Sequence, residues 1–244
     1  DRELDNIDLF YGLGVRAMQL TYNLRNFVGD GCTERCNSGV SYFGVRVIER
    51  MNRLGILLDT AHCGSRTTLD AVEMSKVPIA ATHTTCKGVY MHNRGKTDEE
   101  LKAIAEKGGY VGICQVQPFL GGKGTIKEFL DHVDYAVDLI GADHVGIGTD
   151  TSYESHEPQK LVDMKRQETW GRLPPSGGRW WSGFKPEHYD VGSQTRGDET
   201  RRGSLAWINW PYFTVGLVSR GYSDQEIEMI IGGSFLRLLR KATG

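Results

Sequence analysis

Residues 56–83 read ILLDTAHCGSRTTLDAVEMSKVPIAATH, and this stretch decides the fold. Two short apolar runs, 56–62 and 78–83, enclose a segment whose apolar residues recur at helical spacing. A strand, a helix and a second strand in this order predict two parallel strands joined by a helical crossover. Each apolar run ends in a histidine, His62 or His83, so the same unit also indicates where chemistry could occur.

The alternation of apolar runs and amphipathic segments continues on both sides of this unit. In the segment 65–76 we expect Ser65 to cap the helix, and Thr97 with Glu100 forms the capping-box pattern of a further helix. The strands are continuously apolar, as expected of parallel strands covered on both faces. The expected strands are 14–23, 56–62, 78–83, 110–116 and 144–150, and the expected helices are 43–55, 65–76, 96–109, 124–141, 212–221 and 223–242.

Strands that alternate with helices are typical of two α/β architectures, a doubly wound sheet and a (β/α)8 TIM-like barrel. No glycine-rich phosphate loop follows an expected strand, which disfavours a dinucleotide-binding sheet. Polar residues gather at the carboxyl ends of the expected strands, and in a barrel these positions converge on one mouth. We therefore predict a barrel that forms a single domain over residues 1–244.

The periodic pattern breaks at about 151–205, which contains two adjacent prolines and two glycine pairs. We predict a loop insertion there, since long loops in compact domains are often functional covers. Trp180 and Trp181 argue against simple disorder, and we expect one of them to be partly buried beside the barrel mouth.

Composition excludes several classes of protein. The formal net charge of −2 and the pI of about 6.4 give no sign of a nucleic-acid-binding face. No apolar run approaches the roughly 20 residues that span a bilayer. The five cysteines are widely spread and odd in number, which is typical of reduced thiols. We expect a cytoplasmic protein.

His62 and His83 are the sharpest chemical signal in the sequence. Neutral imidazole is a common zinc ligand, and histidines at the ends of neighbouring barrel strands can bind one metal ion. The alternative is a pair of polar residues that close the barrel mouth. Asp150, also at the end of an expected strand, strengthens the metal hypothesis because a carboxylate near a metal can act as a general base. Otherwise Asp150 is a turn residue.

Three further residues could contact a substrate. Arg94 could bind a carboxylate with both arms of its guanidinium group, although a solvated surface arginine is the simpler interpretation. Tyr22 and Asn23, in LTYNLRN, could donate hydrogen bonds into the site, for instance to an oxyanion. A tyrosine at the end of a strand more often serves packing alone.

Five blocks of sequence resemble the membrane dipeptidase (renal dipeptidase) family of zinc peptidases, in its bacterial form. Their order and spacing make the resemblance specific from about residue 10 onward, and residues 151–205 match least well. The blocks are LTYNLRNFVGDGCTE, GVSYFGVRVIERMNRLGILLDTAHCG, PIAATHTTCKGVYMHNRGKTDEELKAIAEKGGYVGI, DHVGIGTD and GLVSRGYSDQEIEMIIGGSFLRLLR.

The resemblance implies a role for each of these residues. His62 and His83 would be ligands of one of two zinc ions, and Asp150 would accept and pass protons. Arg94 would grip the C-terminal carboxylate of a dipeptide. Tyr22 stands where the renal enzyme has a histidine that contacts the scissile carbonyl oxygen. Gly95 in place of asparagine, and Thr151 with Ser152 in place of Phe-Asp, are departures from the family pattern.

The family also has a His-x-Asp pair and a bridging glutamate that this sequence lacks. We therefore expect a barrel whose N-terminal part is missing, with one weak or empty zinc site in place of two. The predicted function is a zinc-dependent dipeptidase acting on a small peptide with a free C-terminal carboxylate. A related barrel amidohydrolase acting on other amides or lactones, and an inactive scaffold, are the alternatives. We expect no nucleic-acid partner, and a homodimer is left open.

Overall fold

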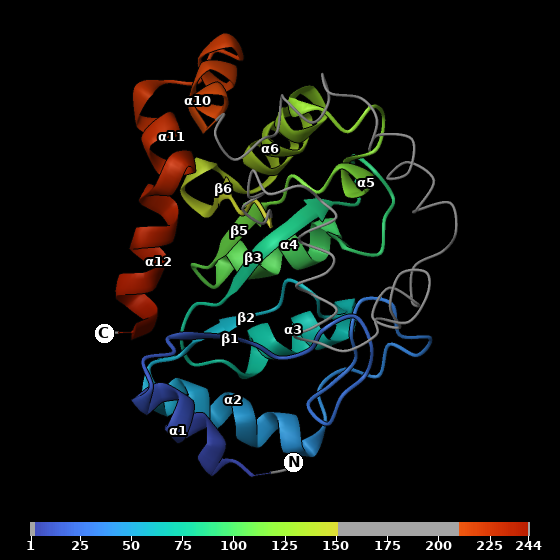
Figure 1. Cartoon of the computed structure of the whole chain (residues 1–244), viewed down its shortest axis with the longest axis vertical. Coiled ribbons are helices and arrows are strands. Elements are labelled where there is room, and N and C mark those ends of the chain that lie inside the picture. The colour runs from blue at the N-terminus through green and yellow to red at the C-terminus, as the bar shows by residue number, and fades with distance from the viewer. Residues whose placement is uncertain (1–2, 151–209, 244) are drawn as a thin grey trace, which may run out of the picture.

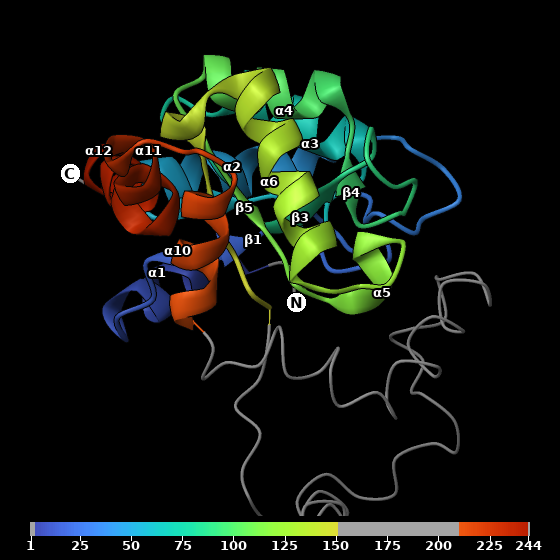
Figure 2. The same ribbon diagram turned by 90° about the horizontal axis from the view of Figure 1, so that it is seen from above.

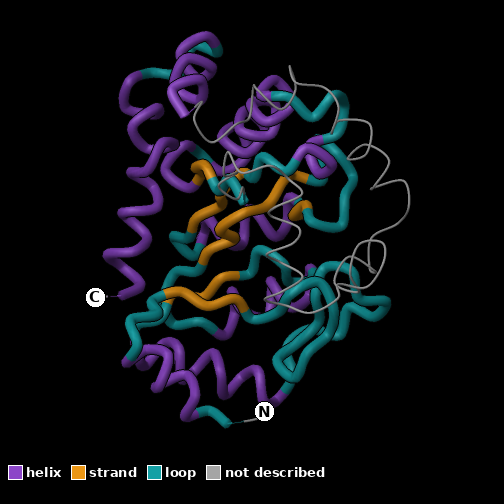
Figure 3. The backbone as a smooth tube through the Cα atoms, in the orientation of Figure 1, coloured by secondary structure: helices purple, strands orange, loops and turns teal. Residues whose placement is uncertain are grey.

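The computed structural model describes residues 3–150 and 210–243, and the statements below concern these residues. A parallel sheet lies at the centre with helices packed around it (Figures 1 and 3). The strands are β1 (Ala17–Gln19), β2 (Leu57–Asp59), β3 (Ala80–Cys86), β4 (Gly95–Lys96), β5 (Tyr110–Ile113) and β6 (Val145–Ile147). The helices are α1 (Asp5–Gly12), α2 (Tyr42–Leu54), α3 (Ser65–Met74), α4 (Asp98–Glu106), α5 (Gln117–Leu120), α6 (Ile126–Ile140), α10 (Trp210–Ser219), α11 (Asp224–Glu228) and α12 (Ser234–Thr243), with the short turns η1 (Ala142–His144) and η4 (Met229–Gly233).

The strand order confirms the α/β class and favours the barrel over the doubly wound sheet. The strands pair in the order β1-β2-β3-β5-β6, all parallel, and the two-residue β4 pairs with β3 beside this path. Strand order therefore rises along the chain without the reversal that defines a doubly wound sheet. The helices α3, α4 and α6 lie on the same side of the strands, as an outer ring of barrel helices does (Figure 2).

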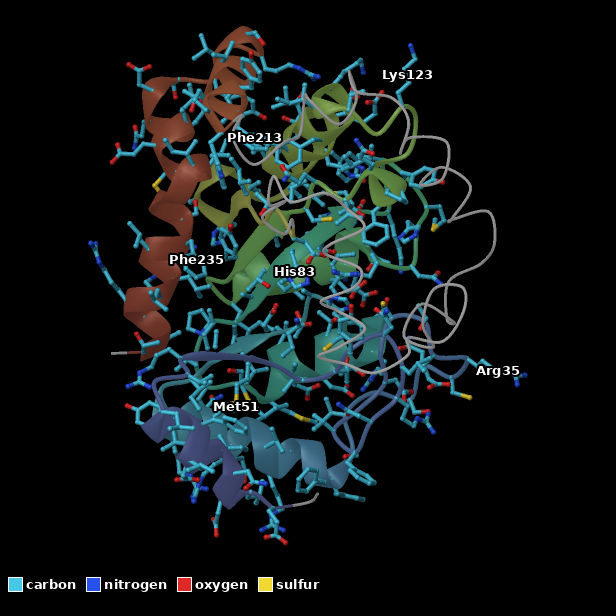
Figure 4. The ribbon with its side chains drawn as sticks, viewed as in Figure 1. Arg35, Met51, His83, Lys123, Phe213 and Phe235 are labelled. Carbon is cyan, nitrogen blue, oxygen red and sulfur yellow. The ribbon has the colours of Figure 1, made fainter. Side chains whose placement is uncertain are left out.

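The core forms between the strands and these helices because both present apolar side chains. Ile48 and Met51 on α2, Leu101 and Ile104 on α4, and Val133 on α6 are each at most 1% exposed. Figure 4 shows Met51 beside β2 and Phe235 of α12 near the other end of the strands. α12 closes part of this core, and Phe235 stacks edge-on against Tyr110 of β5.

Several expected helix boundaries are confirmed by local chemistry. Thr97 and Glu100 form the capping box of α4, and α2 ends before Gly55, which adopts the left-handed φ of 69°. The expectation that Ser65 caps α3 was wrong. Ser65 is the first residue of this helix, and Gly64 occupies the N-cap position. The expected helix 223–242 is also wrong as one unit. It divides into α11, a π-helical turn and α12, with non-helical backbone angles at Gly232.

Four of the observed strands are shorter than expected, β3 is shifted to Ala80–Cys86 instead of 78–83, and three elements were not expected at all. β1 covers only Ala17–Gln19 of the expected 14–23, and the residues that follow it lie in a loop that carries part of the site. The helix α1, the strand β4 and the single-turn helix α5 complete the described chain. Within the described chain no helix combines the length and the apolar character that crossing a bilayer requires. The predicted insertion at 151–205, with Trp180 and Trp181, lies outside the described residues.

We predict that Gly112→Ala destabilises the protein, because the strands β3 and β5 approach too closely there for a side chain. A Cβ atom on Gly112 would lie 2.1 Å from the backbone oxygen of Thr82. Overpacking of this kind costs about 1–3 kcal/mol, and backbone atoms cannot yield as a side chain does. Gly12→Ala is the matched control, since its Cβ would meet no atom within 4 Å. Urea denaturation should separate the two variants, and equal free energies of unfolding would contradict this account.

Candidate metal and substrate site

The two histidines meet in neighbouring strand segments, although β3 does not end at His83 as expected but continues to Cys86. His62 follows β2 by three residues and His83 lies within β3. Because β2 and β3 are parallel and paired, with Asp59 opposite Ala80, both rings reach the same end of the sheet. Their Nε2 atoms are 3.0 Å apart, and Figure 4 shows His83 in the middle of the molecule, beside the strands.

The hydrogen bonds on the far side of each ring determine which nitrogen carries the proton. His62 Nδ1 lies 2.7 Å from Asn23 Oδ1, an amide oxygen that can only accept, so His62 donates from Nδ1. His83 Nδ1 lies 2.8 Å from Thr82 Oγ1, whose own proton is donated to Asp59 at 2.7 Å. His83 therefore also carries its proton on Nδ1.

Consequently both Nε2 lone pairs point at each other with no proton between them. Burial, followed by the charge of Arg94, lowers the pKa of His62 to about 2, and the same two causes lower the pKa of His83. Two neutral imidazoles with facing lone pairs repel each other unless a cation lies between them. Zn–N bonds of 2.0–2.1 Å in tetrahedral geometry place two nitrogens about 3.3 Å apart, so the observed separation suits two ligands of one metal ion.

The rest of a metal coordination sphere is not present in the described chain. Among residues 3–150 and 210–243, no cluster of three or more histidine, cysteine, aspartate or glutamate side chains could hold a metal ion. The residues that are present fit zinc in donor type, tautomer and separation, and they supply two neutral ligands.

The loop that carries His62 is fixed by three successive backbone carbonyl groups. Arg94 donates to the carbonyl of Ala61, the backbone N–H of Cys32 donates to that of His62, and Lys96 donates to that of Cys63. Two of the donors belong to the segment 94–96 and the third is Cys32, so the loop is held from two parts of the chain and cannot shift without breaking a hydrogen bond. This arrangement holds the imidazole of His62 in place.

Arg94 and Lys96 are both buried cations, each 1% exposed. Arg94 donates its second arm to the carbonyl of His83 at 2.8 Å, so one guanidinium group joins the backbones of both histidine-bearing segments. Its Nε has no hydrogen-bond acceptor within the described residues. The alternative interpretation, a solvated surface arginine, is therefore excluded, and the cation lies against the backbone of both histidine-bearing segments.

Lys96 is neutralised by a buried carboxylate. Its ammonium group lies 3.1 Å from Glu100 and donates to Thr68 at 2.7 Å. Glu100 also accepts from Ser65, and it caps α4 through Thr97. Despite its burial, the charge of Lys96 and these hydrogen bonds keep the pKa of Glu100 below its ordinary value. The network connects β4, α3 and α4 behind the His62 loop.

Tyr22 and Asp150 lie at the same end of the sheet. The ring of Tyr22 stacks on the ring of His62 at 4.2 Å between centroids. Burial, followed by the charge of Asp150, raises the pKa of Tyr22, so its phenol stays protonated and can donate. Asp150 is exposed, follows β6 and adopts a left-handed φ of 52°. Its negative charge also acts on His83.

The structure thus brings together the predicted residues His62, His83, Tyr22, Arg94 and Asp150. Asn23 is there as well, but it is 1% exposed and its side-chain oxygen faces His62 Nδ1 and the thiol of Cys32. Its part in substrate binding stays a prediction.

The sequence placed Asp59 among the polar residues at strand ends without a role, and it did not single out Thr82 and Lys96 as parts of this site. Two signals were available, a carboxylate at the end of an otherwise apolar strand and a threonine immediately before a candidate ligand. Nothing in the sequence pattern indicated that Lys96 is buried. His92 and His132, which had no assigned role, are also buried, and His132 accepts a hydrogen bond from the backbone of Cys86.

Comparison with known proteins identifies the family. Residues 1–169 match the family described as membrane dipeptidase, peptidase family M19. An uncharacterized dipeptidase of Schizosaccharomyces pombe is 30% identical over 177 residues, which are 68% of this chain and 42% of the relative. A dipeptidase of Clonostachys rogersoniana is 32% identical over 143 residues, 57% of this chain and 37% of the relative. The chain thus spans less than half the length of these two relatives.

Solved structures show the same fold. An amidohydrolase from Pseudomonas aeruginosa is 31% identical, with a TM-score of 0.78 over 100% of this chain and 69% of that one. A metallopeptidase from Rhodobacter sphaeroides, liganded with a phosphinate mimic of the dipeptide L-Ala-D-Ala, has a TM-score of 0.71 at 23% identity. It aligns with 99% of this chain, which covers 60% of that one.

We predict that Lys96→Met lowers the free energy of unfolding by about 3–5 kcal/mol, since it leaves Glu100 as an uncompensated buried charge. The double variant Lys96→Met/Glu100→Gln should recover part of this loss, because both charges are then removed. Lys102→Met, at an exposed position on α4, is the control and should stay within about 0.5 kcal/mol of the parent. Guanidinium denaturation measures all three, and equal losses for Lys96 and Lys102 would refute a structural role for the buried pair.

Proposed function

Because the chain belongs to the membrane dipeptidase family, peptidase family M19, we propose that it acts as a metal-dependent dipeptidase. One observation carries the proposal, namely the Nε2 lone pairs of two neutral imidazoles, which converge at 3.0 Å. We propose zinc as the metal, with His62 and His83 as ligands of one of two ions in a complete site. The chemistry that zinc supplies when bound is Lewis-acid activation of the attacking water and of the peptide carbonyl.

In this proposal Asp150 moves the proton. Its carboxylate takes the proton of the attacking water and passes it to the leaving amine. Two features support this role. Asp150 is exposed at the mouth of the strands, and its charge reaches both His83 and Tyr22. The left-handed backbone of Asp150 suits a residue held in place for function, since unusual backbone angles often gather at active sites.

Tyr22 and Arg94 bind the substrate in this proposal. The phenol of Tyr22 donates a hydrogen bond to the oxygen of the scissile carbonyl, and its raised pKa keeps the donated proton available. Arg94 provides a fixed positive charge for the C-terminal carboxylate of the dipeptide, and its Nε has no acceptor within the described chain. The substrate would therefore be a short peptide whose free carboxylate lies close to the scissile bond.

A second candidate is an amidohydrolase that acts on other amides or on lactones. The similarity to the Pseudomonas aeruginosa amidohydrolase supports this second candidate, since that structure aligns with the whole of this chain. The two functions share the metal and the proton carrier and differ in the substrate's carboxylate. Parallel assays with L-Ala-L-Ala, L-Ala-D-Ala, N-acetyl-alanine and a simple lactone would separate them, and turnover of the lactone alone would refute the dipeptidase proposal.

We predict that His83→Ala abolishes or greatly weakens zinc binding, because it leaves His62 as a single neutral ligand among the described residues. The measurement is titration with zinc against a chromogenic chelator. His144→Ala is the control, because His144 Nδ1 faces the backbone oxygen of Gly109, far along the sheet from the two rings. Equal zinc affinity in both variants would mean that the metal lies elsewhere.

We predict that Asp150→Asn retains zinc but lowers kcat by about 10²–10⁴-fold, the usual contribution of a general acid or base. An amide cannot accept the proton of the attacking water, whereas its size and its hydrogen-bonding oxygen are nearly unchanged. Metal content and steady-state dipeptide hydrolysis, measured on the same preparation, test this. A variant that loses zinc together with activity would assign Asp150 to metal binding instead.

A further inference from the structure

Asp59 is a buried carboxylate that contacts both histidine-bearing segments. It lies at the end of β2 and is 5% exposed. Its Oδ1 accepts hydrogen bonds from the backbone N–H groups of Ala61, at 3.0 Å, and of Thr82, at 2.9 Å. Its Oδ2 accepts the hydroxyl proton of Thr82 at 2.7 Å. One carboxylate therefore joins the residue before His62 to the residue before His83.

The hydroxyl group of Thr82 transmits the effect of this carboxylate to the imidazole ring. A hydroxyl has one proton to donate, and Thr82 donates it to Asp59. The oxygen of Thr82 can then only accept from its other neighbour, His83 Nδ1, at 2.8 Å. The direction of both hydrogen bonds follows from the charge of Asp59, because a carboxylate has no proton to return.

A local irregularity in β3 makes this contact available. Successive side chains of a regular strand point to opposite faces, which would separate Thr82 from His83. The pairing of β3 with β5 shifts register between Ala81 and Thr84, the segment that contains both residues. Such irregularities re-aim side chains beside functional sites.

We propose that Asp59 is a positioning residue which, through Thr82, keeps the proton of His83 on Nδ1 and so leaves Nε2 free to bind metal. The inference rests on the proposed function only where it concerns the metal. The relay also polarises the imidazole and makes His83 the more basic of the two ligands, since the partner of His62 is the uncharged amide of Asn23.

Asp59→Asn is the sharpest test, because the structure fixes which way the introduced amide must face. Its oxygen stays with the two backbone N–H donors, so its NH₂ group faces Thr82 Oγ1. Thr82 then accepts from this NH₂ group, and among the contacts of its hydroxyl group only His83 Nδ1 can accept the hydroxyl proton, which moves the imidazole proton to Nε2. Thr82→Val removes the relay without reversing it, and Thr82→Ser retains it.

Two measurements on the full chain decide the proposal. Long-range ¹H–¹⁵N NMR of the metal-free protein reports the tautomer of His83, and competition with a chelator reports zinc affinity. We expect the Nδ1–H tautomer in the parent and in Thr82→Ser, and the Nε2–H tautomer in Asp59→Asn. Asp59→Asn and Thr82→Val should each bind zinc about 10–100-fold more weakly, the usual effect of removing an outer-shell partner.

Thr85→Val is the matched control for Thr82→Val. Thr85 lies on the same strand, is buried, and its hydroxyl has no hydrogen-bond partner within the described residues. We expect it to keep the tautomer and the zinc affinity of the parent. If Asp59→Asn retains the Nδ1–H tautomer, the proposal is overturned. If Asp59→Asn fails to fold, an unchanged tautomer of His83 in Thr82→Val overturns the proposal instead. A parent protein that binds no zinc would refute the proposed function, while the tautomer would still decide the role of Asp59.

Discussion

The fixation of three consecutive carbonyl groups, those of Ala61, His62 and Cys63, is the constraint on which the site depends. Each carbonyl accepts from a different donor, Arg94, Cys32 or Lys96. Two of these donors are charged, and charge-assisted hydrogen bonds in a buried setting are among the stronger ones available. A ligand histidine needs a backbone that does not move, and here the strand ends three residues before His62. The cations of the 94–96 segment supply the rigidity that the strand no longer gives.

The same cations shape the electrostatics above them. The charge of Arg94 adds to the effect of burial in lowering the pKa of His62 and of His83. A neutral imidazole is the form that binds a metal ion. Because the charge of Arg94 disfavours protonation of the rings, it keeps them in this form. Lys96 is compensated by Glu100, whereas the guanidinium group of Arg94 contacts two backbone carbonyl oxygens and the ring of Phe119. The carboxylates of Asp59 and Asp150 act on the pKa of His83 in the opposite direction to Arg94, so the rings lie among charges of both signs.

The chemistry extends outward in two shells. Asn23 and Thr82 fix the protons of the two rings, and Asp59 fixes the proton of Thr82. Asp59 also accepts a hydrogen bond from the backbone N–H of Ala61. The same carboxylate therefore orients His83, through Thr82, and contacts the loop that carries His62. Tyr22 stacks on the ring of His62, and the charge of Asp150 acts on its phenol. The residues that would bind, orient and transfer protons thus form one connected network at the carboxyl ends of β1, β2, β3 and β6.

The sequence by itself determined the alternation of the main strands and helices, the α/β class, the capping box of α4 and the two histidines in neighbouring strand segments. These features depend on local periodicity and on neighbours in the chain, which the sequence displays directly. Only the tertiary structure decided that Lys96 is buried, that Arg94 joins the backbones of the two histidine-bearing segments, and that Asp59 reaches His83 through Thr82. Those contacts join residues 11 to 33 positions apart or depend on a register shift within β3. The residues are buried because separate elements pack against one another. A pattern along one chain cannot express such contacts, because they exist only once parallel strands have brought separate segments together.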